Sequence, residues 1–246
     1  MSQSSGDGVV GHSAARLTFD REIVQLRRRL VREAGTAIEM LEAAVVLLAE
    51  PDRDAIAAVL RRDDAVDAEE VSIEEACIRA IALQQPLGKD LRILTFILKV
   101  NADVERVADH ACSLAKIARK LGGTMPPNLP TALKELAERL PIMCQKLMRA
   151  VLDEDVAAAR AVVVMDEVID ALTRRVFDEV LEMMSVETAA GGQAARVALA
   201  NGLHLHRAGR ELERVGDLMG SIAEYVVFLS TGAIIRHAGK RRAESA

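Results

Sequence analysis

The chain has 246 residues, a formal net charge of −5 at pH 7 and an apolar content of 50%. That length suits one large domain or two small ones, and the apolar content is ample for a buried core. Aromatic residues make up only 2% of the chain and Trp is absent, which leaves little for stacking on bases or sugars. Because an acidic chain does not attract phosphate backbones, we expect no nucleic-acid partner.

The sequence shows no recognisable targeting signal and no apolar run typical of a membrane-spanning helix. No apolar run approaches the roughly 20 residues that a membrane-spanning helix requires. The polar, Gly- and Ser-rich beginning lacks the apolar centre of a signal peptide. Cys77, Cys112 and Cys144 lie far apart without a C-x-x-C motif, as expected of reduced thiols. These features predict a cytoplasmic protein with no direct membrane insertion.

Long helical patterns, in which apolar residues recur every three or four positions, fill the chain. Pro51 follows the first pattern, Pro86 suits the first turn of the third, and Gly122 stops the third. Pro141 falls inside the fourth and is expected to bend it. The six expected helices cover about residues 18–49, 54–83, 86–120, 131–152, 155–186 and 193–230.

The helices fall into two sets of three, separated by the clearest linker in the sequence. We therefore predict an all-α fold of two tandem three-helix bundles, six long helices in total, related by internal duplication. The predicted organisation is a disordered N-terminal tail (1–15), a first bundle (16–122), a Pro-rich linker (123–130), a second bundle (131–232) and a C-terminal tail (233–246).

Two short acidic motifs support the duplication, because each occurs once in each half and in the same order. The segment DVERVAD at 103–109 matches ELERVGD at 211–217, which lies 108 positions later. The segment DDAVD at 63–67 matches DEVID at 166–170, which lies 103 positions later. Neither match needs a gap, so we interpret the two halves as copies of one unit.

Each motif places two carboxylates four residues apart, on one face of a helix. Such like-charged neighbours cost about 0.2–0.5 kcal/mol per pair in an isolated helix. Carboxylate oxygens gathered at one place bind hard or borderline cations. If the helices that carry the motifs are antiparallel neighbours, each half has one oxygen-rich candidate metal site. The pairs are Glu105 with Asp109, Glu213 with Asp217, Asp63 with Asp67, and Asp166 with Asp170.

The acidic pairs also suit a solvated helix face that binds no metal, with Arg106 and Arg214 as surface salt-bridge partners. A di-iron bundle site is disfavoured, because it uses Glu-x-x-His and here Ala108 and Gly216 stand at the histidine position. These two small residues suit close helix packing better than a ligand role. Candidate additional ligands are His110, His204 and His206.

The chain resembles the PhoU family of bacterial phosphate-transport and phosphate-signalling regulators over about residues 16–240. The resemblance rests on LQQP at 83–86 followed by DLR at 90–92, on both E-R-V-small-D motifs, and on GAIIRH at 232–237. It implies two three-helix bundles whose E-x-x-x-D motifs hold metal ions, iron or zinc among them, in clusters near the surface. The implied ligands are Glu105, Asp109, Glu213 and Asp217, with Asp63, Asp67, Asp166 and Asp170 as the companion set.

The resemblance also implies a function. Such proteins are similar to adaptors that restrain phosphate uptake and the phosphate-starvation response, and they are not enzymes. The implied partners are the ATPase subunit of the phosphate ABC transporter, a sensor histidine kinase and a second copy in a homodimer. These partners would place the chain at the inner face of the membrane. Only the first half has the hairpin sequence, so the expected partner-binding residues are Gln84, Gln85, Pro86, Asp90 and Arg92.

Two alternative functions remain beside the regulator. A carboxylate-bridged metalloenzyme, a hydrolase or an oxidase, would need buried carboxylates that face a bundle core with open coordination positions. A metal-free helical interaction module would copurify with no metal. The chain also departs from the family pattern, because Ala108 stands where the motif usually has Gly.

Overall fold

The computed structural model describes residues 7–121, 129–188 and 192–232. Side chains are described for residues 16–121, 129–185 and 192–232. Within those ranges the chain is helical apart from short turns, and it contains no strand, as predicted. The helices are α1 (Asp7–Ala49), α2 (Arg53–Gln84), α3 (Gly88–Leu121), α4 (Thr131–Asp153), α5 (Val156–Thr188) and α6 (Gly192–Thr231).

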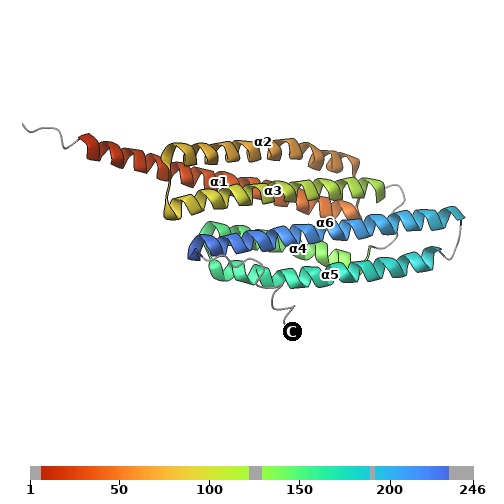
Figure 1. Ribbon diagram of the computed structural model, residues 1–246. Coiled ribbons are helices and arrows are strands. Elements are labelled where there is room, and N and C mark those ends of the chain that lie inside the picture. The colour runs from red at the N-terminus through yellow and green to blue at the C-terminus, as the bar shows by residue number, and fades with distance from the viewer. Residues whose placement is uncertain (1–6, 122–128, 189–191, 233–246) are drawn as a thin grey trace, which may run out of the picture.

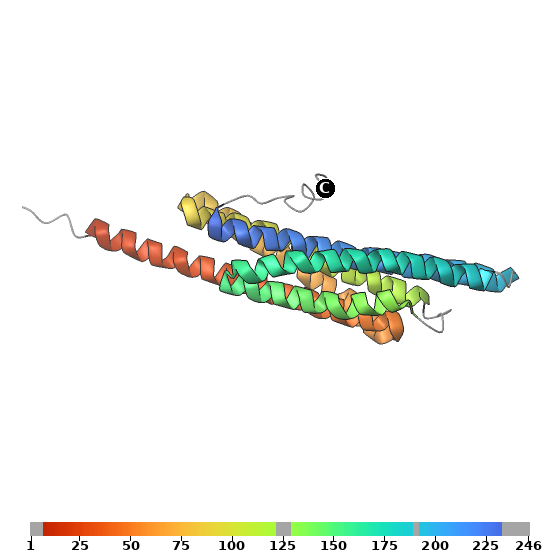
Figure 2. The same ribbon diagram turned by 90° about the horizontal axis from the view of Figure 1, so that it is seen from below.

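The six helices form two three-helix bundles that lie side by side along their length (Figure 1). Within the first bundle α1 packs chiefly on α3, and within the second α5 packs along α6. The bundles meet where α3 lies against α6 and α1 against α4. One continuous apolar core therefore draws buried side chains from all six helices. The N-terminal part of α1 projects beyond both bundles in the two side views (Figures 1 and 2).

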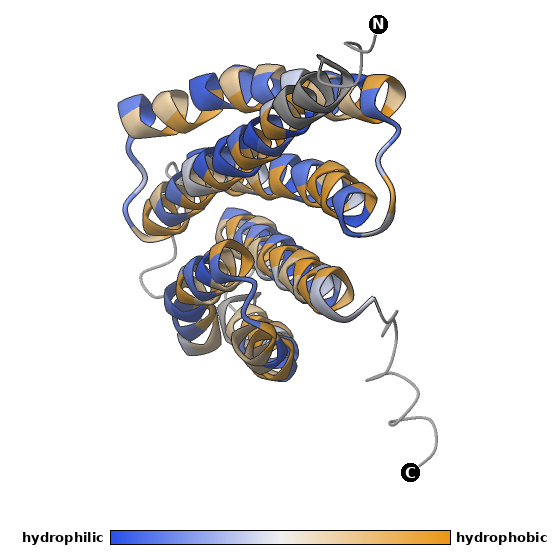
Figure 3. Cartoon of the chain, turned by 90° about the vertical axis from the view of Figure 1, so that its left-hand side faces the viewer, coloured by the Kyte–Doolittle hydropathy of each residue, from blue (hydrophilic) through white to orange (hydrophobic). Residues whose placement is uncertain are grey.

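The helix pattern follows from amphipathic sequence. Leu30, Met40 and Leu41 of α1 are fully buried, as their three- and four-residue spacing predicts. Viewed nearly down the helix axes, apolar and polar stretches alternate along every helix (Figure 3). None of the helices, within the described residues, is long and apolar enough to cross a membrane. The three cysteines are free and buried, and burial raises the pKa of each thiol to about 12.

The starts of α2 and α5 repeat one capping device. The Asp52 carboxylate accepts a hydrogen bond from the backbone N–H of Ala55 at 2.7 Å. The Asp155 carboxylate accepts from Ala157 at 2.9 Å and from Ala158 at 3.0 Å. The two caps lie 103 positions apart, which is the same offset as the acidic motif on these helices. The duplication therefore extends to the helix ends.

Several predicted boundaries are corrected by the structure. The expected tail at 1–15 is wrong over 7–15, because α1 already begins at Asp7; residues 1–6 lie outside the described part. The third helix begins at Gly88 rather than Pro86, because Gln85 takes a left-handed conformation (φ 46°) that closes α2 first. Pro141 lies inside α4, as expected. Most of the predicted linker, and the predicted C-terminal tail at 233–246, lie outside the described residues.

Candidate metal centres

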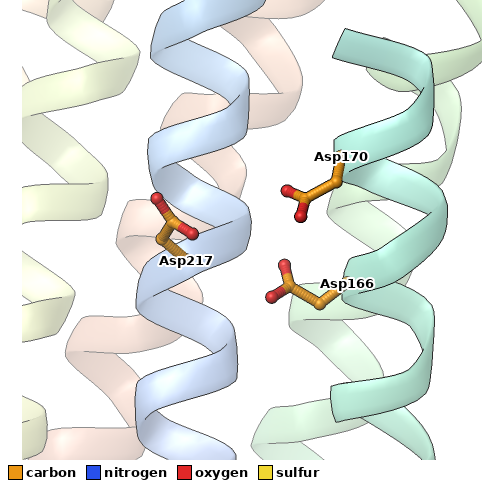
Figure 4. Close-up of side chains that lie close together, drawn as sticks. All are labelled: Asp166, Asp170 and Asp217. Atoms are coloured by element: carbon orange, nitrogen blue, oxygen red, sulfur yellow. The ribbon is translucent and has the colours of Figure 1, made fainter. Parts of the chain in front are cut away.

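In the second bundle the structure brings three carboxylates together from two helices. Asp166 and Asp170 lie one turn apart on α5 and point toward Asp217 on α6 (Figure 4). One oxygen of each lies within 4.8 Å of the others. The fourth predicted residue, Glu213, acts on Asp166 electrostatically but forms an ion pair with Arg210. Three of the four predicted ligands of this half are therefore close enough to share one ion.

Two glycines of α6 set the close approach of these helices. A Cβ atom on Gly216 would lie 2.9 Å from Cγ2 of Ile169 and 3.2 Å from Oδ1 of Asp166. A Cβ atom on Gly220 would lie 3.3 Å from Oδ2 of Asp166. A Cβ at position 216 would force Ile169 to shift, so Gly216 has the packing role that the sequence indicated.

The electrostatics of this cluster favour a cation. Burial, followed by the charges of Asp170, Asp217 and Glu213, raises the pKa of Asp166 to about 6. Its Oδ1 atom is buried and has no hydrogen-bond partner. A buried acceptor among like charges is costly, and a bound cation supplies both the missing partner and the missing charge.

The donor set also limits the kind of ion that fits. All three groups are carboxylates, and Asp217 is exposed while the other two are half-buried. Oxygen donors suit hard or borderline cations, whereas zinc sites usually include sulfur or imidazole nitrogen. When bound, such an ion supplies positive charge between α5 and α6.

The first bundle places its predicted ligands on facing helices but less tightly. Asp63 and Asp67 lie on α2, and Glu105 and Asp109 lie on α3. Burial first, and then the charges of Asp63 and Asp109, raise the pKa of Asp67. Burial and then Asp109 and Asp67 raise the pKa of Glu105. Within the described residues no three of these groups come within 4.8 Å of one another, so the two halves are not equivalent.

The three histidines proposed as additional ligands lie elsewhere. Nδ1 of His110 lies 2.8 Å from Oε2 of Glu211, which joins α3 to α6. His206 makes an edge-on contact with Phe177, with ring centroids 5.4 Å apart. Burial and the charges of nearby cations lower the pKa of His204. None belongs to the carboxylate cluster of the second bundle.

The α2–α3 turn carries the expected partner-binding residues. Gln84 and Gln85 are exposed, whereas Pro86 is buried. The carboxylate of Asp90 pairs with Arg16 at 2.7 Å, and Arg92 is half-buried. The sequence reasoning missed the most exposed apolar side chains of this turn, Leu83 (72%) and Leu87 (83%).

The sequence reasoning also missed three buried acidic residues, Glu33, Asp103 and Glu211. A signal for the first was present. Glu33 lies three residues after Leu30 and four before Ala37, so it occupies a core position of the apolar repeat of α1.

Fold and site together define a duplicated all-helical protein with paired carboxylates on two helices of each bundle. The family model named "PhoU domain" matches residues 30–118 and residues 133–226, one match in each bundle. The chain belongs to the PhoU family.

Named relatives and solved structures agree with this membership. The chain is 33% identical to a "Phosphate-specific transport system accessory protein PhoU homolog" of Deinococcus radiodurans, over 81% of this chain and 90% of the relative. A homologue of the same name from Clostridium acetobutylicum is 26% identical, over 88% and 96%. The crystal structure of the phosphate transport system regulatory protein PhoU from Streptococcus pneumoniae has a TM-score of 0.78 at 25% identity, over 88% of this chain and 98% of that one.

Proposed function

We propose that this chain is a negative regulator of phosphate uptake and of the phosphate-starvation signalling response. The observation that carries the proposal is the likeness to phosphate-specific transport system accessory proteins over most of both chains. The named relatives are accessory or regulatory proteins, which supports a role without catalysis of its own. The chain then works through contacts with other proteins.

The proposed partners are the ATPase subunit of the phosphate ABC transporter and a sensor histidine kinase. The chain acts as an adaptor between them, in the cytoplasm at the inner face of the membrane, and forms a homodimer. The α2–α3 turn is the proposed contact surface, because it exposes Leu83 and Leu87 beside Gln84 and Gln85. Exposed apolar side chains next to polar ones are typical of protein contact sites.

Metal binding at the acidic motifs is the second part of the proposal. In the second bundle Asp166, Asp170 and Asp217 hold an ion, iron or zinc. Asp217 is exposed and the cluster lies near the surface rather than in a sealed core, which argues against the metalloenzyme alternative. The first-bundle ligands remain Asp63, Asp67, Glu105 and Asp109.

The regulatory proposal is tested by recovering partners from native cells grown at high and at low phosphate. The tagged chain should bring down the transporter ATPase subunit or the sensor kinase. Leu87→Asp on the α2–α3 turn should reduce recovery at least tenfold. Leu203→Asp, which changes another exposed Leu on α6, is the matched control and should recover partners normally. Recovery of neither partner under both conditions would overturn the proposal.

The metal proposal needs a separate measurement. Elemental analysis after gentle purification should find iron or zinc, and the Asp166→Asn variant should hold less. If no metal copurifies, and the paired change Glu105→Ala with Glu213→Ala leaves stability and partner binding unchanged, the chain is a metal-free interaction module.

A further inference from the structure

One face of α1 points away from the core and carries exposed apolar residues. Its residues recur every three or four positions, which places them along one side of the helix. Leu17, Val24 and Val46 are 56%, 47% and 60% exposed. Between them lies Gly35, where a Cβ atom would meet nothing within 4 Å. This stripe from Leu17 to Glu50, named the α1 face, is therefore open to a partner.

The charges of the α1 face change sign along the helix. Arg21 and Arg28 are exposed in its first half, and neither forms an ion pair with another described residue. Glu42 and Glu50 follow in its second half, and Glu50 is exposed and likewise unpaired among the described residues. An anionic membrane surface would attract the first half but repel the second. A face that is basic at one end and acidic at the other complements itself when one copy is turned end for end.

A groove borders the acidic half of the α1 face. It lies between the end of α1 and the start of α4, and its volume is about 450 Å³. Val46, Leu133 and Pro141 are among its apolar lining residues. Its charged residues are three glutamates and one lysine, namely Glu42, Glu50, Glu138 and Lys134. The groove therefore suits a helix that presents apolar residues and arginines on one face.

Residues at equal distances from Gly35 complement one another. Arg28 and Glu42 each lie 7 positions from Gly35. Val24 and Val46 each lie 11 positions from it. Two copies of α1 that pack antiparallel about Gly35 therefore bring arginine against glutamate and valine against valine, and each contact occurs twice.

The position of α4 leaves room for this pairing. The end of α4 lies beside the middle of α1, where Arg27 pairs with Glu154 at 2.8 Å. Figure 2 shows the earlier part of α1 extending beyond the end of α4. In an antiparallel pair this uncovered part of one copy faces the groove of the other, so the two α4 helices lie at opposite ends of the contact.

We propose that two copies of the chain associate through the α1 face, antiparallel about Gly35, with Arg21 and Arg28 of each copy at the groove of the other. The inference rests on the proposed homodimer and adds the surface that forms it. The second bundle lacks the basic half of such a face, because at the 103-residue offset the two arginines correspond to Thr124 and Thr131. The contact therefore belongs to α1 and has no equivalent in the second half of the chain.

The first test exchanges the charges of one predicted pair. Sedimentation equilibrium of the full-length chain should show a dimer, and Arg28→Glu or Glu42→Arg alone should weaken it at least about tenfold, because each places like charges opposite one another. An equimolar mixture of the two variants should restore the dimer, since each then supplies the charge that the other lacks. Recovery in the mixture also shows that both variants fold. Arg160→Glu, which changes an exposed arginine on α5, is the matched control and should dimerise like wild type.

A second test fixes the direction of the two helices. The paired change Val24→Cys with Val46→Cys should form a disulfide-linked dimer on oxidation. Positions 24 and 46 lie about 33 Å apart along one helix, so the bond must join two copies. Val24→Cys alone should remain unlinked, because antiparallel packing also separates the two copies of position 24. The three native cysteines are buried and should not interfere.

Three outcomes would overturn the α1 face as the homodimer contact. A dimer that both charge variants leave equally stable would place the contact elsewhere. A wild-type chain that stays monomeric at every concentration would overturn the homodimer as well. A monomer whose recovery of the transporter ATPase subunit or the sensor kinase falls with Arg28→Glu would show that these partners bind the face. The proposed phosphate regulation is judged separately in each case, by partner recovery from native cells.

Discussion

The two bundles carry the same acidic motifs, yet only the second gathers three carboxylates among the described residues. The difference lies in the helix that faces the aspartates. On α6, Gly216 and Gly220 let the Asp166 carboxylate approach the helix backbone. The equivalent positions of α3 are Ala108 and Cys112, and both side chains are buried.

Cys112 shows how the first bundle uses the same space. Its Sγ atom lies 4.0 Å from the backbone carbonyl oxygen of Val59, and it interacts with Asp63, the counterpart of Asp166. A thiol thus lies where the second bundle has only the hydrogen of Gly220. Motif spacing thus places carboxylates on facing helices, whereas the size of the residues between the helices decides how closely the carboxylates approach one another.

The largest loss of stability is expected from a methyl group added where α6 lies closest to α5. Gly216→Ala should destabilise the fold by about 2–3 kcal/mol, because the new Cβ meets Ile169 at 2.9 Å. Gly35→Ala is the matched control in α1, where a Cβ meets nothing within 4 Å, and should stabilise by up to about 1 kcal/mol. Urea unfolding measures both changes. Equal effects of the two substitutions would show that Gly216 does not set the helix spacing.

The buried acid of the first bundle gives a pH-dependent prediction. The folded pKa of Glu33 is raised from 4.5 to about 8, so the unfolded chain releases this proton at lower pH than the folded chain. Wild-type stability, measured without metal, should therefore fall as pH rises across that window. Glu33→Gln removes the fall and should be more stable than wild type by about 4 kcal/mol at pH 8, but not at pH 4. Leu136, its counterpart, contributes no such dependence. Parallel pH profiles for wild type and variant would contradict the assignment.

Asp103 and Glu211 occupy equivalent positions in the two halves. Removing the charge of each should change the stability of the fold in opposite directions. Burial raises the pKa of Asp103 to about 6, so its ionisation destabilises the fold as pH rises from 3.8 to about 6. The hydrogen bond from His110 lowers the pKa of Glu211, so its contribution is present at neutral pH and lost as pH falls through its folded pKa. At pH 7, Asp103→Asn should stabilise and Glu211→Gln destabilise, each by about 1 kcal/mol. Thermal unfolding of both variants at pH 7 tests this, and shifts of the same sign would refute it.

The helix caps should behave most alike in the two halves. Asp52→Ala and Asp155→Ala each remove a side-chain acceptor at a helix start and should cost about 1 kcal/mol. The loss should be slightly larger for Asp155, whose carboxylate accepts two backbone hydrogen bonds. Chemical denaturation resolves the pair. A clearly larger loss of stability for Asp52→Ala would show that the number of backbone hydrogen bonds accepted by the cap does not decide which loss is greater.

Sequence reasoning recovered the features that depend on local pattern. Apolar periodicity and the gap-free repeats were sufficient for the all-helical, duplicated fold, which the structure and the family match confirm. The facing acidic helices of each half follow from the short connections between them. The closeness of the carboxylates could not be read from spacing, because it depends on packing between α5 and α6 at Gly216 and Gly220.

Other features could not be predicted from the sequence, because they depend on contacts between distant segments or on the conformation of a single residue. The His110 contact with Glu211 joins residues that are 101 positions apart. The start of α3 moved because Gln85 tolerates a left-handed conformation, which no periodicity reports. The burial of Glu33 could have been predicted, because the apolar repeat of α1 places this acidic residue at a core position.

The shared core of the two bundles has a consequence for cooperativity. Buried side chains of all six helices form one cluster, and α3 packs directly on α6. The halves therefore lack separate interiors, and calorimetry should record a single unfolding transition rather than two. Under that linkage, an ion that binds only the folded chain raises the melting temperature of the whole molecule, whichever bundle holds it. An ion bound in one bundle thereby stabilises helices that do not contact it.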